Sequence, residues 1–195
     1  MAAVKPKRHS PTMDMTAMCD VAFLLLTFFI MTSSFRSQEA VSINTPSSVS
    51  KLIVEETGIG TVSITPEGKY FFGVTDPIEK RRFLDALNTN LKMDLSNDQK
   101  KSFLEVAEIG VGKDKIKSYL SLSKGDREKA VLPGIPLDST NTELIEWVRA
   151  YAEANPQGQL AIRGDVQTQY PAVKILFDEL AKIKFYKFRL ITKGE

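Results

Sequence analysis

Residues 15–35 read MTAMCDVAFLLLTFFIMTSSF and form the one long apolar stretch of this 195-residue chain. As a helix that rises about 1.5 Å per residue, the stretch would extend about 31 Å, which matches the hydrocarbon core of a bilayer. It carries one carboxylate, Asp20, and the uncharged residues after Asp20 would extend only about 22 Å. A full span therefore draws Asp20 into the membrane, and we predict a transmembrane helix over residues 14–35.

Charged residues on either side of this stretch predict its orientation. Three basic residues precede it, namely Lys5, Lys7 and Arg8. On the far side Arg36 and Glu39 cancel, and positive charge favours the cytoplasmic side of a membrane helix. We therefore expect residues 1–13 to be a cytoplasmic tail and the chain after the span to lie outside. A cleaved signal peptide is the alternative, but no Ala-x-Ala cleavage site follows the stretch.

Composition argues against several classes of function. The net charge is +2, without a basic stripe or zinc-ligand spacing, so we expect no nucleic-acid binding. Cys19 is the single cysteine and His9 the single histidine, which excludes an internal disulfide, a cysteine-rich metal site and a histidine-based triad in the folded domain. The glycine pairs at residues 58–60 and 110–112 lack the third glycine of a nucleotide loop. We expect no enzyme activity, no cofactor, no metal, and solvated carboxylates in the folded domain.

The remainder of the chain predicts a linker and one folded domain. Residues 36–51 are rich in serine and are typical of a linker, and the domain is expected over residues 52–195. Val62 and Ile64 alternate with polar residues, and a Thr-Pro-Glu-Gly turn then leads to an aromatic run. This pattern predicts a β-hairpin.

Two helices of the domain have recognisable starts. Asp76 is a typical N-cap and is followed by Pro77, which suits the first position of a helix. Thr140 and Glu143 have the spacing of a capping box, so we expect a second helix to open there.

Residues 94–137 predict a separate, helical insertion. Ser96 and Gln99 form a possible capping box, and the apolar residues that follow continue until Gly110, which suits a helix end. A second short helix is expected to bury Ile116, Tyr119 and Leu120 and to stop near Gly125. Residues 124–136 are expected to be a loop.

The carboxyl-terminal part predicts a βαβ unit. A strand over residues 159–163, a helix opened by Pro171 and a last strand over residues 185–192 should place the two strands parallel. The expected fold class is α+β: one amino-terminal transmembrane helix, then a small mixed β-sheet domain with helices packed on it and a helical insertion.

Asp20 is the candidate functional residue. At about 100° per residue, three hydroxyl residues fall within about 40° of one another on the side that Asp20 occupies. They are Thr16, Thr27 and Ser34. Lipid offers no hydrogen-bond partners, so this stripe should face another helix or a hydrated path, and intramembrane acids usually mark proton or ion pathways. The alternatives are an N-cap at the membrane boundary and an acid that pairs with a partner helix only for assembly.

Residues 14–29, DMTAMCDVAFLLLTFF, resemble the ExbD/TolR family, the proton-driven inner-membrane stator components of TonB and Tol systems. The family pattern is an acid or Asn, an apolar residue, Thr, Pro, two apolar residues, then Asp and a leucine-rich run. Here Asp14 begins the motif and Asp20 occupies the second acidic position. The resemblance implies that Asp20 carries the proton. It also implies a bacterial inner-membrane location, a periplasmic outer domain, and a helix that sits, usually as a pair, in a pore made by an ExbB/TolQ-like oligomer.

The resemblance has two departures. Ala17 stands where the family usually has proline, so the helix should start earlier or run straighter. The insertion over residues 94–137 means that contacts with a TonB-like periplasmic partner cannot be carried over. Residues 41–46 occupy the place of a short extended segment, which fits either a gate or a tether.

The resulting functional hypothesis is an energy-transducing subunit driven by the proton-motive force, which powers outer-membrane transport through a TonB-like protein. Two alternatives stay open: a membrane-tethered periplasmic binding domain whose span is only an anchor, and a TolR-like role in envelope integrity.

Overall fold

The computed structural model describes most of the chain in two compact units. The described residues are 15–33, 43, 47–48, 58–138, 140–191 and 193–194. One unit comprises residues 1–37 and the other residues 38–195, and each is considered by itself. The predicted tail over residues 1–13 and most of the predicted linker, including residues 41–46 apart from Ile43, lie outside the described residues.

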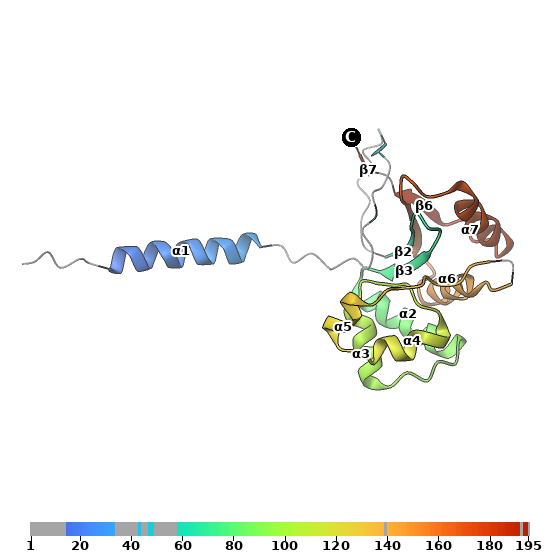
Figure 1. The fold of residues 1–195 in the computed structure, drawn as a ribbon, viewed down its shortest axis with the longest axis horizontal. Coiled ribbons are helices and arrows are strands. Elements are labelled where there is room, and N and C mark those ends of the chain that lie inside the picture. Colours follow the sequence, from blue (N-terminus) through green and yellow to red (C-terminus); the bar gives the residue numbers. More distant parts are fainter. Residues whose placement is uncertain are drawn as a thin grey trace, which may run out of the picture. The chain divides into compact units, whose positions relative to one another are not determined.

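The smaller unit is described as one helix, α1 (Thr16–Thr32), which is labelled in Figure 1. It has 17 residues, so its axis is about 26 Å long. Within the described residues, no helix combines the length and the hydropathy needed to cross a bilayer.

The larger unit is built on a five-stranded mixed sheet in the order β4-β3-β2-β5-β6. The strands are β2 (Ile59–Ile64), β3 (Tyr70–Val74), β4 (Glu108–Ile109), β5 (Gln159–Gly164) and β6 (Phe188–Ile191). Strand β3 is antiparallel to both of its neighbours, whereas β5 is parallel to β2 and to β6. A separate two-residue pairing joins β1 (Ser47–Ser48) to β7 (Lys193–Gly194). The predicted hairpin and the parallel pairing of the last two strands of the sheet are confirmed.

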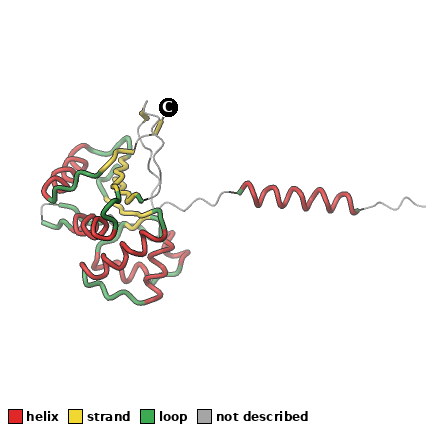
Figure 2. Tube along the Cα trace, turned by 180° about the vertical axis from the view of Figure 1, so that it is seen from behind, coloured by secondary structure: helices red, strands yellow, loops and turns green. Residues whose placement is uncertain are grey.

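Six helices accompany this sheet among the described residues. They are α2 (Pro77–Asn90), α3 (Asn97–Glu105), α4 (Lys113–Leu120), α5 (Lys124–Lys129), α6 (Glu143–Ala154) and α7 (Tyr170–Lys182). Seen from behind, the red helices of this unit gather to one side and one end of the yellow strands (Figure 2). Because side chains alternate along a strand, one face of the sheet can supply the core that these helices cover.

The centre of the core is aromatic. Phe72 on β3 packs against Phe83 on α2 and against Trp147 and Tyr151 on α6, with ring centroids 5.0–6.2 Å apart. All four side chains are almost fully buried, and aromatic rings contribute the largest apolar areas to a core. Helix α7 adds Leu176 to the same cluster, so the βαβ unit and the hairpin share one core.

Local capping signals were predicted correctly at two helix starts. The Asp76 carboxylate accepts hydrogen bonds from the first turn of α2, which also has Pro77 at its start. Ser96 and Gln99 form the reciprocal capping box of α3. A third prediction was wrong: Thr142 precedes α6 without a side-chain cap, and Asp138 instead accepts hydrogen bonds from the backbone of Thr140 and Asn141 in the turn before the helix.

The region over residues 94–137 differs from the prediction. Helix α3 ends at Glu105, and β4 then pairs with β3, so the predicted helix end at Gly110 was wrong. Gly110 is needed for another reason, because an added Cβ would lie 2.1 Å from the ring of Phe71. Helix α5 replaces part of the loop predicted over residues 124–136.

This region is therefore part of the domain rather than a separate piece. Phe103, Ile116 and Leu120 belong to the same buried cluster as the sheet residues. The last strand of the sheet also begins later than predicted, at Phe188, because the chain first turns through Lys184, whose φ is 54°.

Candidate functional site

Asp20 is the one charged residue of α1 and lies one turn after Thr16. Its side chain is exposed, and the described part of the chain provides its carboxylate with no hydrogen-bond or ion-pair partner. No residue of the helix is buried. A charge in apolar surroundings is stable only when it is paired or hydrated, and α1 itself supplies no group that pairs with this carboxylate.

Apolar side chains surround α1 on every side. More than half of the surface of each is exposed, as it is for Met15, Met18, Val21, Phe23, Leu24, Leu25, Leu26, Phe28, Phe29, Ile30 and Met31. A helix that is apolar all round is typical of a buried helix, either in a large protein core or in a membrane. The surface of α1 therefore suits apolar surroundings, and Asp20 is the one charged residue in this surface.

The hydroxyl groups of α1 behave differently from Asp20. Thr27 is half-buried, and its Oγ1 donates to the carbonyl oxygens of Leu24 at 2.9 Å and Phe23 at 3.1 Å. A threonine hydroxyl satisfied in this way needs no further acceptor outside the helix. Of the other residues in the predicted stripe and motif, Thr16 begins α1, and Ser34 and Asp14 lie outside the described residues.

Buried polar groups in the larger unit include a cluster that the sequence did not reveal. Arg163 on β5 donates through one guanidinium nitrogen to Glu108 Oε1 at 2.9 Å and through Nε to Ser63 Oγ at 3.2 Å. Ser63 Oγ in turn donates to the same Glu108 oxygen at 2.8 Å. Glu108 is 6% exposed, so the expectation that the domain's carboxylates are solvated was wrong. The cluster joins β2, β4 and β5 and has a structural role.

Glu143 is a second buried carboxylate with a structural role. Its Oε1 accepts from the backbone N–H of Lys113 at 2.6 Å and from the indole N–H of Trp147 at 3.3 Å. Burial raises the pKa of Glu143, and these two hydrogen bonds oppose the shift. The contact caps the start of α4 and ties it to α6, because an open helix start leaves backbone N–H groups without acceptors.

Lys80 is a buried cation. It is 6% exposed, and its ammonium group donates to the carbonyl oxygens of Leu104, at 3.2 Å, and Val106. Burial lowers the pKa of Lys80 to about 8. The side chain therefore ties α2 to the end of α3, and its partners are distant in sequence, so no local pattern predicted it.

The described residues contain no group of three or more His, Cys, Asp or Glu side chains placed to hold a metal ion. The polar residues of the larger unit discussed above all connect its elements to one another. Asp20 therefore remains the candidate functional residue, because no described residue pairs with its carboxylate.

The chain thus consists of one apolar helix that carries a single acid, followed by a small α+β domain, and this arrangement is the class of protein to which it belongs. The family model "Biopolymer transport protein ExbD/TolR" matches residues 6–195, so the chain belongs to this family. Membership links the chain to biopolymer transport in general and favours an inner-membrane location, and proteins of this family work in membrane complexes with ExbB- and TonB-like partners.

A curated relative supports the same assignment over part of the chain. The chain is 36% identical over 53 residues to the protein named biopolymer transport protein exbD2 of Vibrio cholerae serotype O1. The match covers 27% of this chain and 40% of that relative. No solved structure gives a significant match.

Proposed function

We propose that this chain is the proton-motive-force-driven stator subunit of an ExbB–ExbD–TonB-like inner-membrane complex, with Asp20 as the protonatable intramembrane carboxylate. One observation carries the proposal: Asp20 is the single charged residue in a 17-residue helix that exposes apolar side chains all round. Placing an aspartate at the centre of a membrane helix costs about 2.5–3.5 kcal/mol on insertion scales. Such an acid is usually kept because it moves or binds an ion.

Proton binding would change the surface that α1 prefers. A neutral carboxyl can lie against an apolar wall, whereas an ionised one must face water or a hydrogen-bond donor. The membrane potential contributes about 2.3 kcal/mol per charge per 100 mV, which is enough to bias each step. Successive binding and release at Asp20 would therefore turn or shift the helix in one direction.

The other half of the proton path would belong to a partner. A pair of α1 helices would sit inside an oligomer of a multi-span, ExbB/TolQ-like protein, which supplies the groups that Asp20 faces in each state. The periplasmic domain would then pass the motion to a TonB-like protein. A single α1 helix carries no Lys or Arg and cannot form a proton path alone, because lipid offers the Asp20 carboxylate no hydrogen-bond partner.

The test replaces the carboxyl group of Asp20 by an amide, which has nearly the same shape but cannot bind and release a proton. In cells that lack the native chain, Asp20→Asn should abolish TonB-dependent uptake, whereas Cys19→Ser, a neutral change one residue away, should leave it intact. Membrane levels of both variants are compared by immunoblot. Normal uptake with Asp20→Asn refutes the proposal.

The same strains separate the two alternatives. If the span is only an anchor, an unrelated apolar helix in place of residues 15–33 restores function. If the role is TolR-like, Asp20→Asn leaves uptake intact and instead makes the cells sensitive to detergent.

A further inference from the structure

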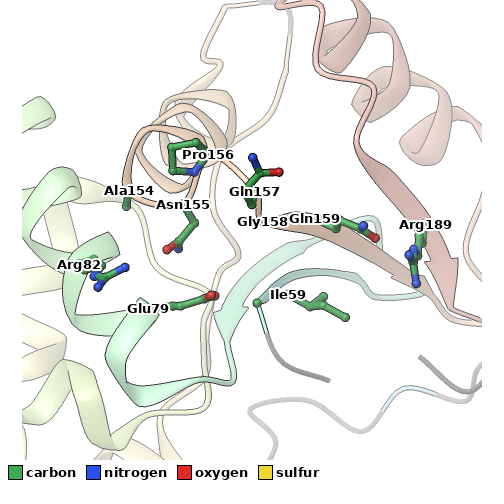
Figure 3. Close-up of a pocket in the computed structure, with 11 residues that line it drawn as sticks. Ile59, Glu79, Arg82, Ala154, Asn155, Pro156, Gln157, Gly158, Gln159 and Arg189 are labelled. Carbon is green, nitrogen blue, oxygen red and sulfur yellow. The ribbon is translucent and has the colours of Figure 1, made fainter. Parts of the chain in front are cut away.

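The larger unit contains an open cleft of about 700 Å³, away from the groups discussed above. Its walls come from the start of β2, the first two turns of α2, the turn between α6 and β5, and β6 (Figure 3). Ligand sites in proteins commonly have volumes of about 300–1,000 Å³. The size of the cleft therefore suits a small molecule.

Two buried polar atoms border this cleft without a partner among the described residues. Asn155 is 7% exposed, and its Nδ2 makes no hydrogen bond to any described residue. The same is true of Oε2 of Glu79, whose carboxylate lies over the backbone of Gly58. Figure 3 shows Asn155 reaching down toward Glu79, which projects from the opposite wall. A buried polar atom without a partner costs about 1–3 kcal/mol, so both atoms favour a bound group that satisfies them.

The two atoms require opposite kinds of hydrogen-bond partner. Nδ2 of Asn155 is a donor and requires an acceptor, whereas a carboxylate oxygen of Glu79 requires a donor or a cation. Burial, followed by the charge of Asp76, raises the pKa of Glu79. An ammonium group at this oxygen would relieve both effects.

Cationic side chains occupy other positions on the wall. Arg82 lies beside Glu79 and Asn155, and Arg189 lies at the other end of the cleft, next to Gln159 (Figure 3). Both guanidinium groups belong to exposed residues, and a guanidinium binds a carboxylate through two parallel hydrogen bonds. Side-chain amides such as that of Gln159 both donate and accept, as a peptide group does. The described lining residues include no aromatic side chain, so the site favours a polar ligand with both charges rather than a flat apolar one.

We propose that this cleft binds a small zwitterion of the dipeptide class, with its ammonium group at Glu79 and its carboxylate at Arg189. The carbonyl oxygen of the ligand accepts from Asn155, and Gln159 pairs with the peptide group. The proposal is independent of α1, because every residue that it uses belongs to the larger unit.

The test uses the full chain in detergent and the dipeptide alanylglycine, with binding measured by titration calorimetry and saturation-transfer NMR. Two capped forms, N-acetyl-alanylglycine and alanylglycinamide, each lack one charge. We expect each cap to weaken binding by about tenfold or more, which corresponds to about 1.4 kcal/mol. Glu79→Gln should have the effect of the acetyl cap, and Arg189→Gln the effect of the amide cap.

Matched controls lie elsewhere on the same unit. Glu128→Gln and Arg149→Gln change exposed residues outside the cleft and should leave binding unchanged. Arg189 is exposed, so its variant keeps the test valid even where Glu79→Gln destabilises the fold. The proposal is overturned if alanylglycine does not bind at millimolar concentration, or if the capped forms bind equally well. It is also overturned if inorganic phosphate binds more tightly and Glu79→Gln leaves that binding unchanged, since the cleft would then be an anion site.

Discussion

The two units of this molecule differ in whether their charged side chains have hydrogen-bond partners within the unit. Among the described residues of the larger unit, four charged side chains are buried and each is hydrogen-bonded: Lys80, Glu108, Arg127 and Glu143. In α1 the carboxylate of Asp20 has no partner within the described part of the chain. Each of these four buried charges thus has a hydrogen-bond partner within the larger unit, whereas the described residues supply none for the carboxylate of Asp20.

The largest expected effect comes from moving the acid around α1. Exchanging two neighbours, Cys19→Asp together with Asp20→Cys, keeps the composition of the helix but turns the carboxylate by about 100°. We expect TonB-dependent uptake to be lost completely, because the acid no longer faces the groups that the partner supplies. Uptake is measured in cells with matched membrane levels of the chain. Normal uptake in the exchanged variant would show that the position of the acid around α1 is unimportant. Asp20 would then not depend on a specific partner group.

The next effect concerns a charge that the larger unit does pair. Glu108→Leu removes the buried carboxylate that pairs with the partly buried Arg163, and breaking a buried pair destabilises a protein by about 3–5 kcal/mol. Urea denaturation followed by the fluorescence of Trp147, the single tryptophan, measures the change.

Two further variants show whether the pair itself is responsible. Adding Arg163→Met to Glu108→Leu removes both charges and should recover part of the lost stability. Asp98→Asn, in an exposed pair with Lys101, should change nothing measurable. Equal losses in the single and double variants would mean that shape rather than charge holds these strands together.

The contrast also explains which features the sequence could predict. Asp20 stood out because one acid interrupts an apolar run, and the caps at Asp76 and Ser96 were visible because their partners lie within three residues. The sequence predicts solvated carboxylates throughout the domain and gives no sign that Glu108 is buried, since its partner Ser63 lies 45 residues away along the chain. Local patterns carry local hydrogen bonds, whereas pairings across the sheet depend on the fold.

The same limit applies to β4 and to the cleft. Residues 108–109 follow a helical pattern, and only their pairing with β3 makes them a strand. Glu79 and Asn155 line the same cleft because α2 packs against α6, as the contact between the rings of Phe83 and Tyr151 shows. A pattern read along the chain contains neither fact.

A smaller effect is expected from Lys80, whose burial has a signature in pH. Its pKa is about 8 in the folded chain and 10.5 ordinarily, so between these values the unfolded chain binds more protons. Stability from this group therefore rises with pH across that window, by up to about 3 kcal/mol. In Lys80→Met the rise should be absent. The difference between the two chains in urea titrations from pH 7.5 to 10.5 measures it, because the contributions of other groups cancel. Parallel curves would mean that the ammonium group is hydrated rather than buried.

The smallest effect is expected from Thr27, which shares a predicted helix face with Asp20. Its hydroxyl already donates to two carbonyl oxygens of α1, so Thr27→Val removes a group that the helix satisfies by itself. We expect uptake to fall far less than with Asp20→Asn, although both residues lie on the same side. Uptake assays of the two variants in one strain make the comparison. If Thr27→Val instead abolishes uptake, the hydroxyl takes part in the proton path, and α1 then requires a partner for its whole polar face rather than for one carboxylate.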